Sequence, residues 1–128
     1  MKNLKSIVRL LSAYDEGERF FIDCDLDGSL QAANLKGVTF KECFLLCDFR
    51  GANLEGARFE KCNLKTCSFR EANLTDTVIT KCSVEGIDFI DANVGRLKFN
   101  CNYYMGSTMN QNDLQGFCSN PLLRQSQD

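Results

Sequence analysis

Apolar residues recur at every fifth position through the middle of the chain. From Phe49 to Phe99 this spacing runs without a slip, and a small or apolar residue stands two positions earlier in nearly every repeat, as Ala52 does before Leu54. An α-helix repeats every 3.6 residues and a β-strand every two, so neither explains a strict five. The apolar positions are Phe49, Leu54, Phe59, Leu64, Phe69, Leu74, Ile79, Val84, Phe89, Val94 and Phe99.

A period of five fits a short extended segment followed by a corner. Residues i−2 and i of the extended piece point to the same side, and the remaining residues turn the chain. Asn53 before Leu54 and Gly56 after it have the chemistry that corners favour, because asparagine bonds nearby backbone and glycine adopts positive φ. Repetition of this unit predicts a solenoid coiled around its own apolar residues.

The alternation of aromatic and aliphatic residues also predicts the number of sides of each solenoid coil. Phenylalanine stands at 49, 59, 69, 89 and 99, with leucine or valine mostly between, so like residues stack only if the number of sides is even. Two sides leave no interior for rings, which favours four sides and about 20 residues per coil. Two steps are shortened to four residues, from Leu26 to Leu30 and from Leu45 to Phe49. They predict one shortened corner per turn.

Short segments with this rhythm resemble a known repeat. Residues 33–37, 52–56 and 72–76 read ANLKG, ANLEG and ANLTD. They are similar to the A(N/D)LXX unit of the pentapeptide-repeat family, over roughly residues 21–104. The resemblance implies an all-β solenoid, a right-handed quadrilateral β-helix of about four coils. Residues 10–14 and 17–19 also resemble the short N-terminal helix of cyanobacterial members.

The two ends of the chain are expected to cap the solenoid. Leu4, Ile7, Val8 and Leu11 follow helical spacing, which predicts a capping helix over residues 2–14, with Asn3 as its N-cap and Gly17 after its end.

A short terminal helix is expected over residues 107–117. Ser107 or Thr108 would cap it and Pro121 would stop it, leaving residues 122–128 as a disordered tail. These segments divide the chain into a cap (1–17), a β-helix (18–106) and a C-terminal cap and tail (107–128).

Composition narrows the functional classes. The 17 acidic and 15 basic residues nearly balance, which makes direct nucleic-acid binding unexpected. The chain has no histidine, the commonest general base and metal ligand, and no phosphate-binding glycine loop. No apolar run is long enough for a membrane span or a signal peptide. We therefore expect a cytoplasmic protein that is not an enzyme and has no cofactor, metal site or membrane contact.

Eight cysteines suggest a metal or redox site, but six of them follow the five-residue repeat. Each of these six takes the position two residues before an apolar residue, where alanine otherwise stands: Cys24, Cys43, Cys47, Cys62, Cys67 and Cys82. Free cysteine is commonly a small buried residue. Stacked neighbours have parallel Cβ vectors, a poor geometry for disulfides, and a linear column lacks tetrahedral convergence for zinc. Packing is therefore favoured.

The other two cysteines do not follow the five-residue repeat. Cys101 points outward and Cys118 follows the repeats. We hypothesise a Cys101–Cys118 disulfide that pins the C-terminal cap, although a reducing cytosol argues against it. A redox-responsive role through these two thiols is an alternative function.

The favoured function is a non-catalytic structural or protein-interaction module, monomeric and with an unknown protein partner. Two outward columns are the candidate interaction surface: Arg50 with Arg70, and Lys61 with Lys81.

The family resemblance adds a second alternative, because some members mimic DNA and occupy DNA gyrase. That role needs an acidic rod. Residues 47–101 hold eight acidic and eight basic residues, a net charge of zero, and four coils give a rod of only about 20 Å. The acidic residues are Asp48, Glu55, Glu60, Glu71, Asp76, Glu85, Asp88 and Asp91, and the basic ones are Arg50, Arg58, Lys61, Lys65, Arg70, Lys81, Arg96 and Lys98.

Overall fold

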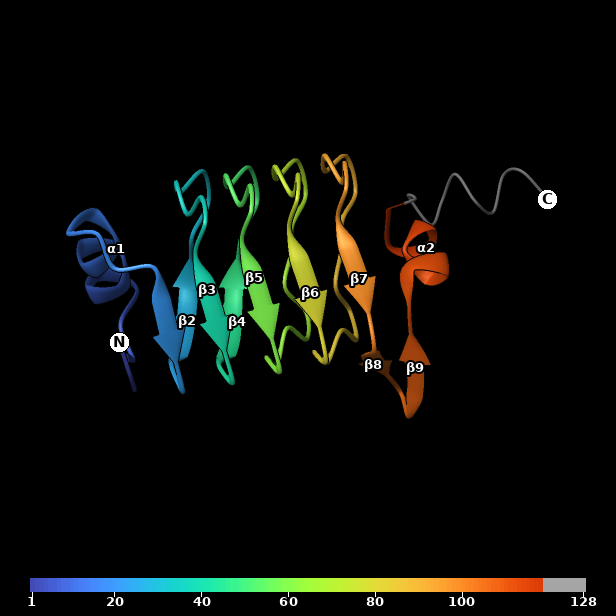
Figure 1. Ribbon diagram of the computed structural model, residues 1–128, viewed down its shortest axis with the longest axis horizontal. Helices are drawn as coiled ribbons and strands as arrows, with labels where there is room; N and C mark the ends of the chain where they lie inside the picture. Colours follow the sequence, from blue (N-terminus) through green and yellow to red (C-terminus); the bar gives the residue numbers. More distant parts are fainter. Residues whose placement is uncertain (119–128) are drawn as a thin grey trace.

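The chain winds into four complete right-handed coils and the start of a fifth, stacked into a short rod (Figure 1). The computed structural model describes residues 1–118. Its elements in chain order are α1 (Ile7–Asp15), β1 (Phe20–Ile22), β2 (Asp25–Ser29), β3 (Thr39–Lys41), β4 (Phe44–Asp48), β5 (Arg58–Glu60), β6 (Val78–Thr80), β7 (Lys98–Asn100), β8 (Asn102–Tyr104), β9 (Ser107–Met109), η1 (Gln111–Asp113) and α2 (Gln115–Cys118).

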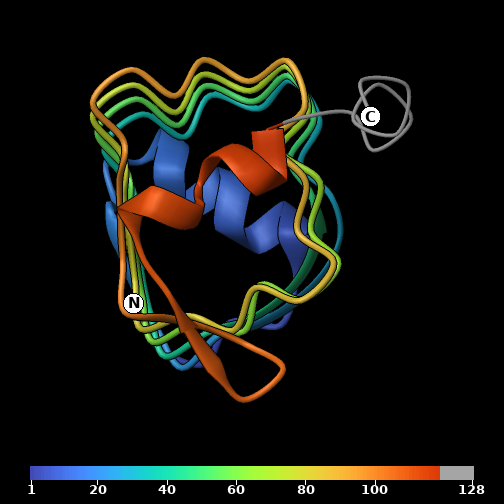
Figure 2. The ribbon, with the colours of Figure 1, turned by 90° about the vertical axis from the view of Figure 1, so that its right-hand side faces the viewer.

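Each coil has four faces, which we number in chain order. Face 1 is a parallel sheet in the order β1-β3-β5-β6-β7. Face 2 begins with the parallel pair β2–β4 and continues as single bridges. Faces 3 and 4 are columns of single bridges, such as Asp48↔Ser68 on face 3 and Asn53↔Asn73 on face 4. Viewed along the rod, the coils superpose as a four-sided outline (Figure 2). The four-sided prediction is confirmed.

The inward residue of each five-residue unit, here called the central residue, fills the core. All central residues from Phe21 to Phe89 are at most 2% exposed. Phenylalanines stack along faces 1 and 3; the rings of Phe49 and Phe69 lie 4.9 Å apart and nearly parallel. Rings of the two faces also meet edge to face, as Phe49 and Phe59 do at 5.8 Å. The interior is thus filled by its own side chains.

The corners combine a tight turn with a left-handed residue. At the corner after Phe49, the amide of Ala52 donates to the Phe49 carbonyl at 3.0 Å, and Gly51 between them has φ of 69°. This arrangement is a type II turn. Glu71 occupies the same position one coil later with φ of 60°. Most side chains avoid this conformation, so the backbone bonds between coils must offset its cost.

The shortened corner belongs only to the first two coils. There β2 and β4 run straight from face 2 toward face 3, and they pair in register over five residues. In the third coil the same corner gains one residue, because Phe44 bridges Asn63 whereas Asp48 bridges Ser68. Thr66 adopts φ of 63° at this enlarged corner. The expected recurrence in every turn is therefore wrong beyond the second coil.

The N-terminal helix begins later than the sequence pattern predicted. Residue Ser6 is its N-cap, and its hydroxyl accepts a hydrogen bond from the amide of Arg9. The predicted cap Asn3 instead has φ of 59° and pairs with the edge of β1. The first residues thus extend the sheet of face 1, which removes them from the helix. Gly17 follows the helix end as predicted, and its amide bonds the Tyr14 carbonyl.

The C-terminal cap contains an antiparallel hairpin that the sequence did not indicate. β8 and β9 pair before the helical part, so Ser107 lies in a strand rather than at a helix start. The helical part, η1 and α2, begins after Asn110 instead of Ser107 or Thr108. The predicted stop at Pro121 and the tail over 122–128 lie outside the described residues. No helix within residues 1–118 is long and apolar enough to cross a membrane.

Candidate interaction surface

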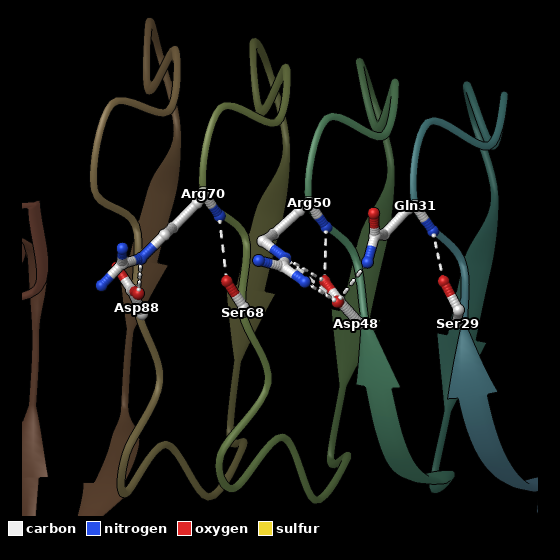
Figure 3. Close-up of polar contacts among 7 residues, drawn as sticks. All are labelled: Ser29, Gln31, Asp48, Arg50, Ser68, Arg70 and Asp88. Carbon is white, nitrogen blue, oxygen red and sulfur yellow. Dashed lines mark hydrogen bonds and ion pairs between the residues drawn. The ribbon is translucent and has the colours of Figure 1, made fainter.

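A ladder of polar side chains runs along the outside of face 3 (Figure 3). The residues before and after each central residue point outward, and the register between coils stacks them in two columns. One column holds serine and aspartate, and the other holds glutamine and arginine. The ladder comprises Ser29, Asp48, Ser68 and Asp88 in the first column, and Gln31, Arg50 and Arg70 in the second.

Arg50 binds the aspartate of its own coil. Its Nε donates to both oxygens of Asp48 at 3.1 and 3.0 Å, and its Nη2 donates to Oδ2 at 2.9 Å. Gln31 from the previous coil donates to the same Oδ2 at 2.7 Å. The Arg50 hydrogen bonds lower the pKa of Asp48 below its ordinary value. The carboxylate is therefore held in its charged form by groups from two coils.

Arg70 instead binds the aspartate of the next coil. Ser68 occupies the position equivalent to Asp48, and its hydroxyl accepts only from the Arg70 backbone amide at 3.4 Å. The Arg70 Nε consequently donates to Asp88 (Figure 3). The predicted stacking of Arg50 on Arg70 is found, since the amide of Gly51 donates to the Arg70 carbonyl at 2.9 Å. Both side chains remain 53% exposed despite their ion pairs.

The two lysines predicted alongside the arginines lie elsewhere. Lys61 and Lys81 stack at the corner between faces 1 and 2, with φ of 55° and 58°, and both are exposed. Arg50 and Arg70 lie at the corner between faces 3 and 4, which is diagonally opposite in the four-sided coil. The structure therefore brings the members of each pair together and keeps the pairs apart.

A groove lies beside the arginine ladder where the corner changes length. The extra residue of the third coil places Thr66 above β4, and the space between the two coils measures about 330 Å³. Its walls are formed by β4 and by the third coil. The lining residues are Leu46, Cys47, Asp48, Arg50, Thr66, Ser68 and Arg70.

Large apolar side chains are exposed on β4, and one of them, Leu46, lines the groove. Phe44 and Leu46 flank the inward Leu45 and are 48% and 44% exposed. Neither residue was among those predicted from the sequence to form the interaction surface. Three consecutive apolar residues, 44–46, are a usable signal, because alternation along a strand forces two of them outward.

The six cysteines that follow the five-residue repeat are buried in two columns, as predicted. Their thiols donate to carbonyls of the coils, as Cys67 does to Leu45 at 3.0 Å. Burial raises the pKa of Cys24 and of Cys67 to about 11. At neutral pH these groups stay protonated, which suits packing better than metal binding. Within residues 1–118 no group of three or more Cys, Asp or Glu side chains is placed to hold a metal ion.

A buried asparagine, not another cysteine, continues the longer column. Asn102 lies above Cys82 and is fully buried. Its Oδ1 accepts from the Cys82 amide at 2.9 Å, and its Nδ2 donates to the Ile79 carbonyl at 3.0 Å.

Cys101 and Cys118, the predicted disulfide partners, are both free thiols in the structure. Cys101 is exposed at a left-handed corner, and its amide donates to Asn110 Oδ1 at 2.9 Å. Cys118 ends α2 and packs against the core, and burial raises its pKa. Whether the two thiols pair under oxidising conditions stays a prediction.

Stacked coils with four faces, tight turns at the corners and an enclosed apolar core define a quadrilateral β-solenoid. The model of the family described as pentapeptide repeats matches this chain in eight copies, over residues 21–65, 47–86 and 67–100. These ranges cover more than half of the 128 residues. The chain belongs to the pentapeptide-repeat family.

Solved structures of the same fold support this assignment. The pentapeptide repeat protein alr5209 from Nostoc PCC 7120 is similar with a TM-score of 0.63 and 21% identity, over 93% of this chain and 98% of that one. QnrB1, a plasmid-mediated fluoroquinolone resistance protein, is similar with a TM-score of 0.56 and 22% identity, over 65% of this chain and 46% of that one. The chain thus spans less than half of QnrB1. No curated protein matches the sequence significantly.

Proposed function

We propose that this protein is a non-catalytic interaction module that binds another protein through the groove beside the arginine ladder. The observation that carries the proposal is the exposure of Leu46 in the groove next to Arg50 and Arg70, with Phe44 also exposed two residues earlier on β4. Single exposed apolar residues are common, but two on one short strand beside a groove favour a contact surface.

The chemistry of the groove indicates what it would bind. Leu46 offers an apolar contact, and Arg50 and Arg70 offer guanidinium groups that are half exposed. Arginine is enriched in protein interfaces because it combines a charge with a flat apolar surface. A partner segment with an apolar side chain beside a carboxylate would fit, since its carboxylate could share Arg70 with Asp88.

Affinity capture from a lysate of the native organism, followed by mass spectrometry, tests the proposal. The variant Leu46→Ser with Arg70→Ala should recover a specific partner at least about tenfold less than the native chain, because it removes both kinds of contact. Lys81→Ala is the matched control, since Lys81 is a basic, exposed residue at the opposite corner. Each variant must keep its native thermal unfolding curve.

Two outcomes would contradict the proposal. Equal recovery by the native chain and the double variant would remove the groove as the binding surface. Loss of the partner in Lys81→Ala alone would place the contact at the Lys61–Lys81 column instead.

The two alternative functions stay predictions. At 22% identity, the likeness to QnrB1 shows the fold alone. A gyrase supercoiling assay that finds inhibition at stoichiometric protein would favour the DNA-mimic alternative over the interaction module. A change in thermal stability on oxidation would favour the redox alternative.

A further inference from the structure

Face 2 carries most of the large apolar side chains that the described residues expose. Phe44 and Leu46 lie on this face in the second coil. Tyr103 and Met105, which are 48% and 76% exposed, lie on it where the chain starts the fifth coil. The other exposed side chains of this kind within residues 1–118 are Met1, Val8 and Phe20. Apolar side chains that gather on one exposed face mark a contact surface.

The register between coils arranges the outward residues of face 2 in two columns. We call the part of one coil that lies on one face a rung. Single bridges join the residues of the first column in the order Phe44, Asn63, Ser83 and Tyr103. Two positions further along each rung, on the same side of the strand, the second column comprises Leu46, Lys65, Glu85 and Met105. Each column is therefore apolar at its two ends and polar in the middle.

This order makes the ends of the face complementary to each other in two antiparallel copies. A two-fold axis parallel to the strands, passing between the third and fourth coils, places the second rung of each copy opposite the fifth rung of the other. Phe44 then faces the partner's Tyr103, which brings two aromatic rings together. Leu46 faces the partner's Met105. All four of these side chains, now exposed, would be covered by the contact.

The middle of the face is complementary in charge under the same axis. Within one chain, Lys65 Nζ lies 3.7 Å from Glu85 Oε2, and the two side chains remain 53% and 31% exposed. Each charge is therefore also available to a second copy. The axis places Lys65 opposite the partner's Glu85, and Asn63 opposite the partner's Ser83. Opposite charges and hydrogen-bonding groups thus meet across the face, which fixes the register of such a contact.

The turn of the β8–β9 hairpin is placed to reach a second copy. It consists of Met105 and Gly106, which have φ of 48° and 83° as a two-residue hairpin turn requires. Figure 2 shows this turn projecting beyond the outline of the lower coils. The Met105 amide donates to Glu85 Oε1 at 2.8 Å, which ties the turn to the fourth coil. The projecting Met105 would meet the partner's Leu46 at the edge of the groove that Leu46 lines.

The acidic first rung favours the antiparallel arrangement over a parallel one. Asp25 and Asp27 occupy this rung in the two columns. In a parallel pair, with the axis along the rod, Asp25 would face the partner's Asp27, and like charges would repel. In the antiparallel pair Asp25 instead faces the partner's Thr108, which lies beside Tyr103 in the hairpin. The threonine hydroxyl can donate to a carboxylate.

We propose that two copies of this chain associate through face 2 in this antiparallel arrangement. The inference rests on the proposed function, because it names a second copy as the protein that contacts Leu46 in the groove. It replaces the monomer expected from the sequence. Rungs about 4.8 Å apart give the face a length of only about 20 Å, so the interface lies at the small end of specific contacts. We therefore expect a dissociation constant on the order of tens of micromolar.

Sedimentation equilibrium of the purified full chain, between about 5 and 500 µM, tests the proposal. The native chain should show a monomer–dimer equilibrium. Lys65→Glu and Glu85→Lys should each weaken it at least about tenfold, because each places two pairs of like charges across the face. An equimolar mixture of the two variants should restore dimerisation to within about threefold of the native chain, since every carboxylate then faces a lysine. A role of either residue in folding alone would give no such rescue.

Arg96→Glu is the matched control for the charge reversals. Arg96 forms an exposed ion pair with Asp76 of the previous coil, as Glu85 does with Lys65. It lies at the corner after face 4, away from face 2, so the variant should dimerise like the native chain. Each variant must keep a cooperative thermal unfolding curve.

The apolar contact has its own test. Leu46→Ser and Met105→Ser should each weaken dimerisation about tenfold, because each removes one side of the contact between Leu46 and the partner's Met105. Val8→Ser is the control, since Val8 is an equally exposed apolar residue on α1. It should leave the dissociation constant unchanged.

Three outcomes would overturn the proposal. A native chain that stays monomeric at about 500 µM would exclude the second copy as partner. A dimer that the charge reversals leave intact, or that their mixture fails to restore, would exclude the antiparallel contact through face 2. A dimer unchanged by Leu46→Ser would separate the contact from the groove. The proposed function fails by a different result, which is equal recovery from the lysate by the native chain and the variant Leu46→Ser with Arg70→Ala.

Discussion

On face 1 the first residues of the chain add a strand segment at the N-terminal end, whereas at the C-terminal end side chains pair the sheet edge. The amide of Asn3 donates to the Ile22 carbonyl at 3.0 Å, and the Ile22 amide donates to Met1 at 2.9 Å. At the other end, the side chain of Gln111 pairs both the Phe99 amide in β7 and the Leu97 carbonyl just before it. Both ends satisfy a sheet edge, but only the first continues the backbone pattern.

The helices at the two ends also differ in how much core they cover. α1 buries Leu10, Ala13 and Tyr14 over the first coil. α2 has four residues and none of them is buried; its main contact is Phe117, whose ring lies 5.6 Å from Phe99. We therefore expect the N-terminal cap to stabilise the solenoid more than the C-terminal cap does.

The largest expected effect comes from the core on which both caps rest. Phe69→Asp should largely abolish folding, because it places an unpaired charge in a fully buried ring stack. Circular dichroism during thermal unfolding measures it. Phe69→Leu is the control and should fold with a loss of roughly 1 kcal/mol, since it keeps an apolar side chain. A Phe69→Asp protein with native melting behaviour would show that the inward assignment is wrong.

The next effect compares the two caps directly. Leu10→Ala should destabilise the protein by about 3 kcal/mol, because Leu10 is fully buried between α1 and the first coil. Phe117→Ala should cost less, about 1.5 kcal/mol, because Phe117 is only partly buried. Urea unfolding of both variants provides the measurement. A larger loss for Phe117→Ala would reverse the ranking of the ends.

The regular core could be predicted from the sequence because every central position requires an apolar side chain that points into the solenoid. A polar residue in place of Phe49 or Leu54 would disrupt the apolar stack. The five-residue spacing of apolar residues is therefore sufficient to predict the solenoid. The C-terminal hairpin could not be predicted, because Tyr104 and Met105 end the period without a turn signal stronger than Gly106. Likewise, the sequence shows Arg50 stacked on Arg70 but not that one binds within its coil and the other between coils.

The smallest expected effect concerns face 4. Among the described residues, contacts close this face at its N-terminal end. At the N-terminal end the hydroxyl of Tyr14 donates to the Lys36 carbonyl at 2.6 Å, and the Arg19 guanidinium stacks 3.6 Å from the ring centre. Tyr14→Phe keeps the ring and the stacking and removes only this hydrogen bond. It should cost about 1 kcal/mol, because the Lys36 carbonyl loses its donor in a partly buried hydrogen bond.

Urea unfolding and the exchange of nearby amides measure this loss together. Tyr14→Phe should speed exchange of the Leu35 amide, which bonds Asn53 at the first rung of face 4, and leave Val94 unchanged. Such a local response would mean that the two ends of face 4 are closed independently. An equal change at Val94 would instead show that the whole face opens as one cooperative unit, so that the caps differ in construction but not in the stability they confer.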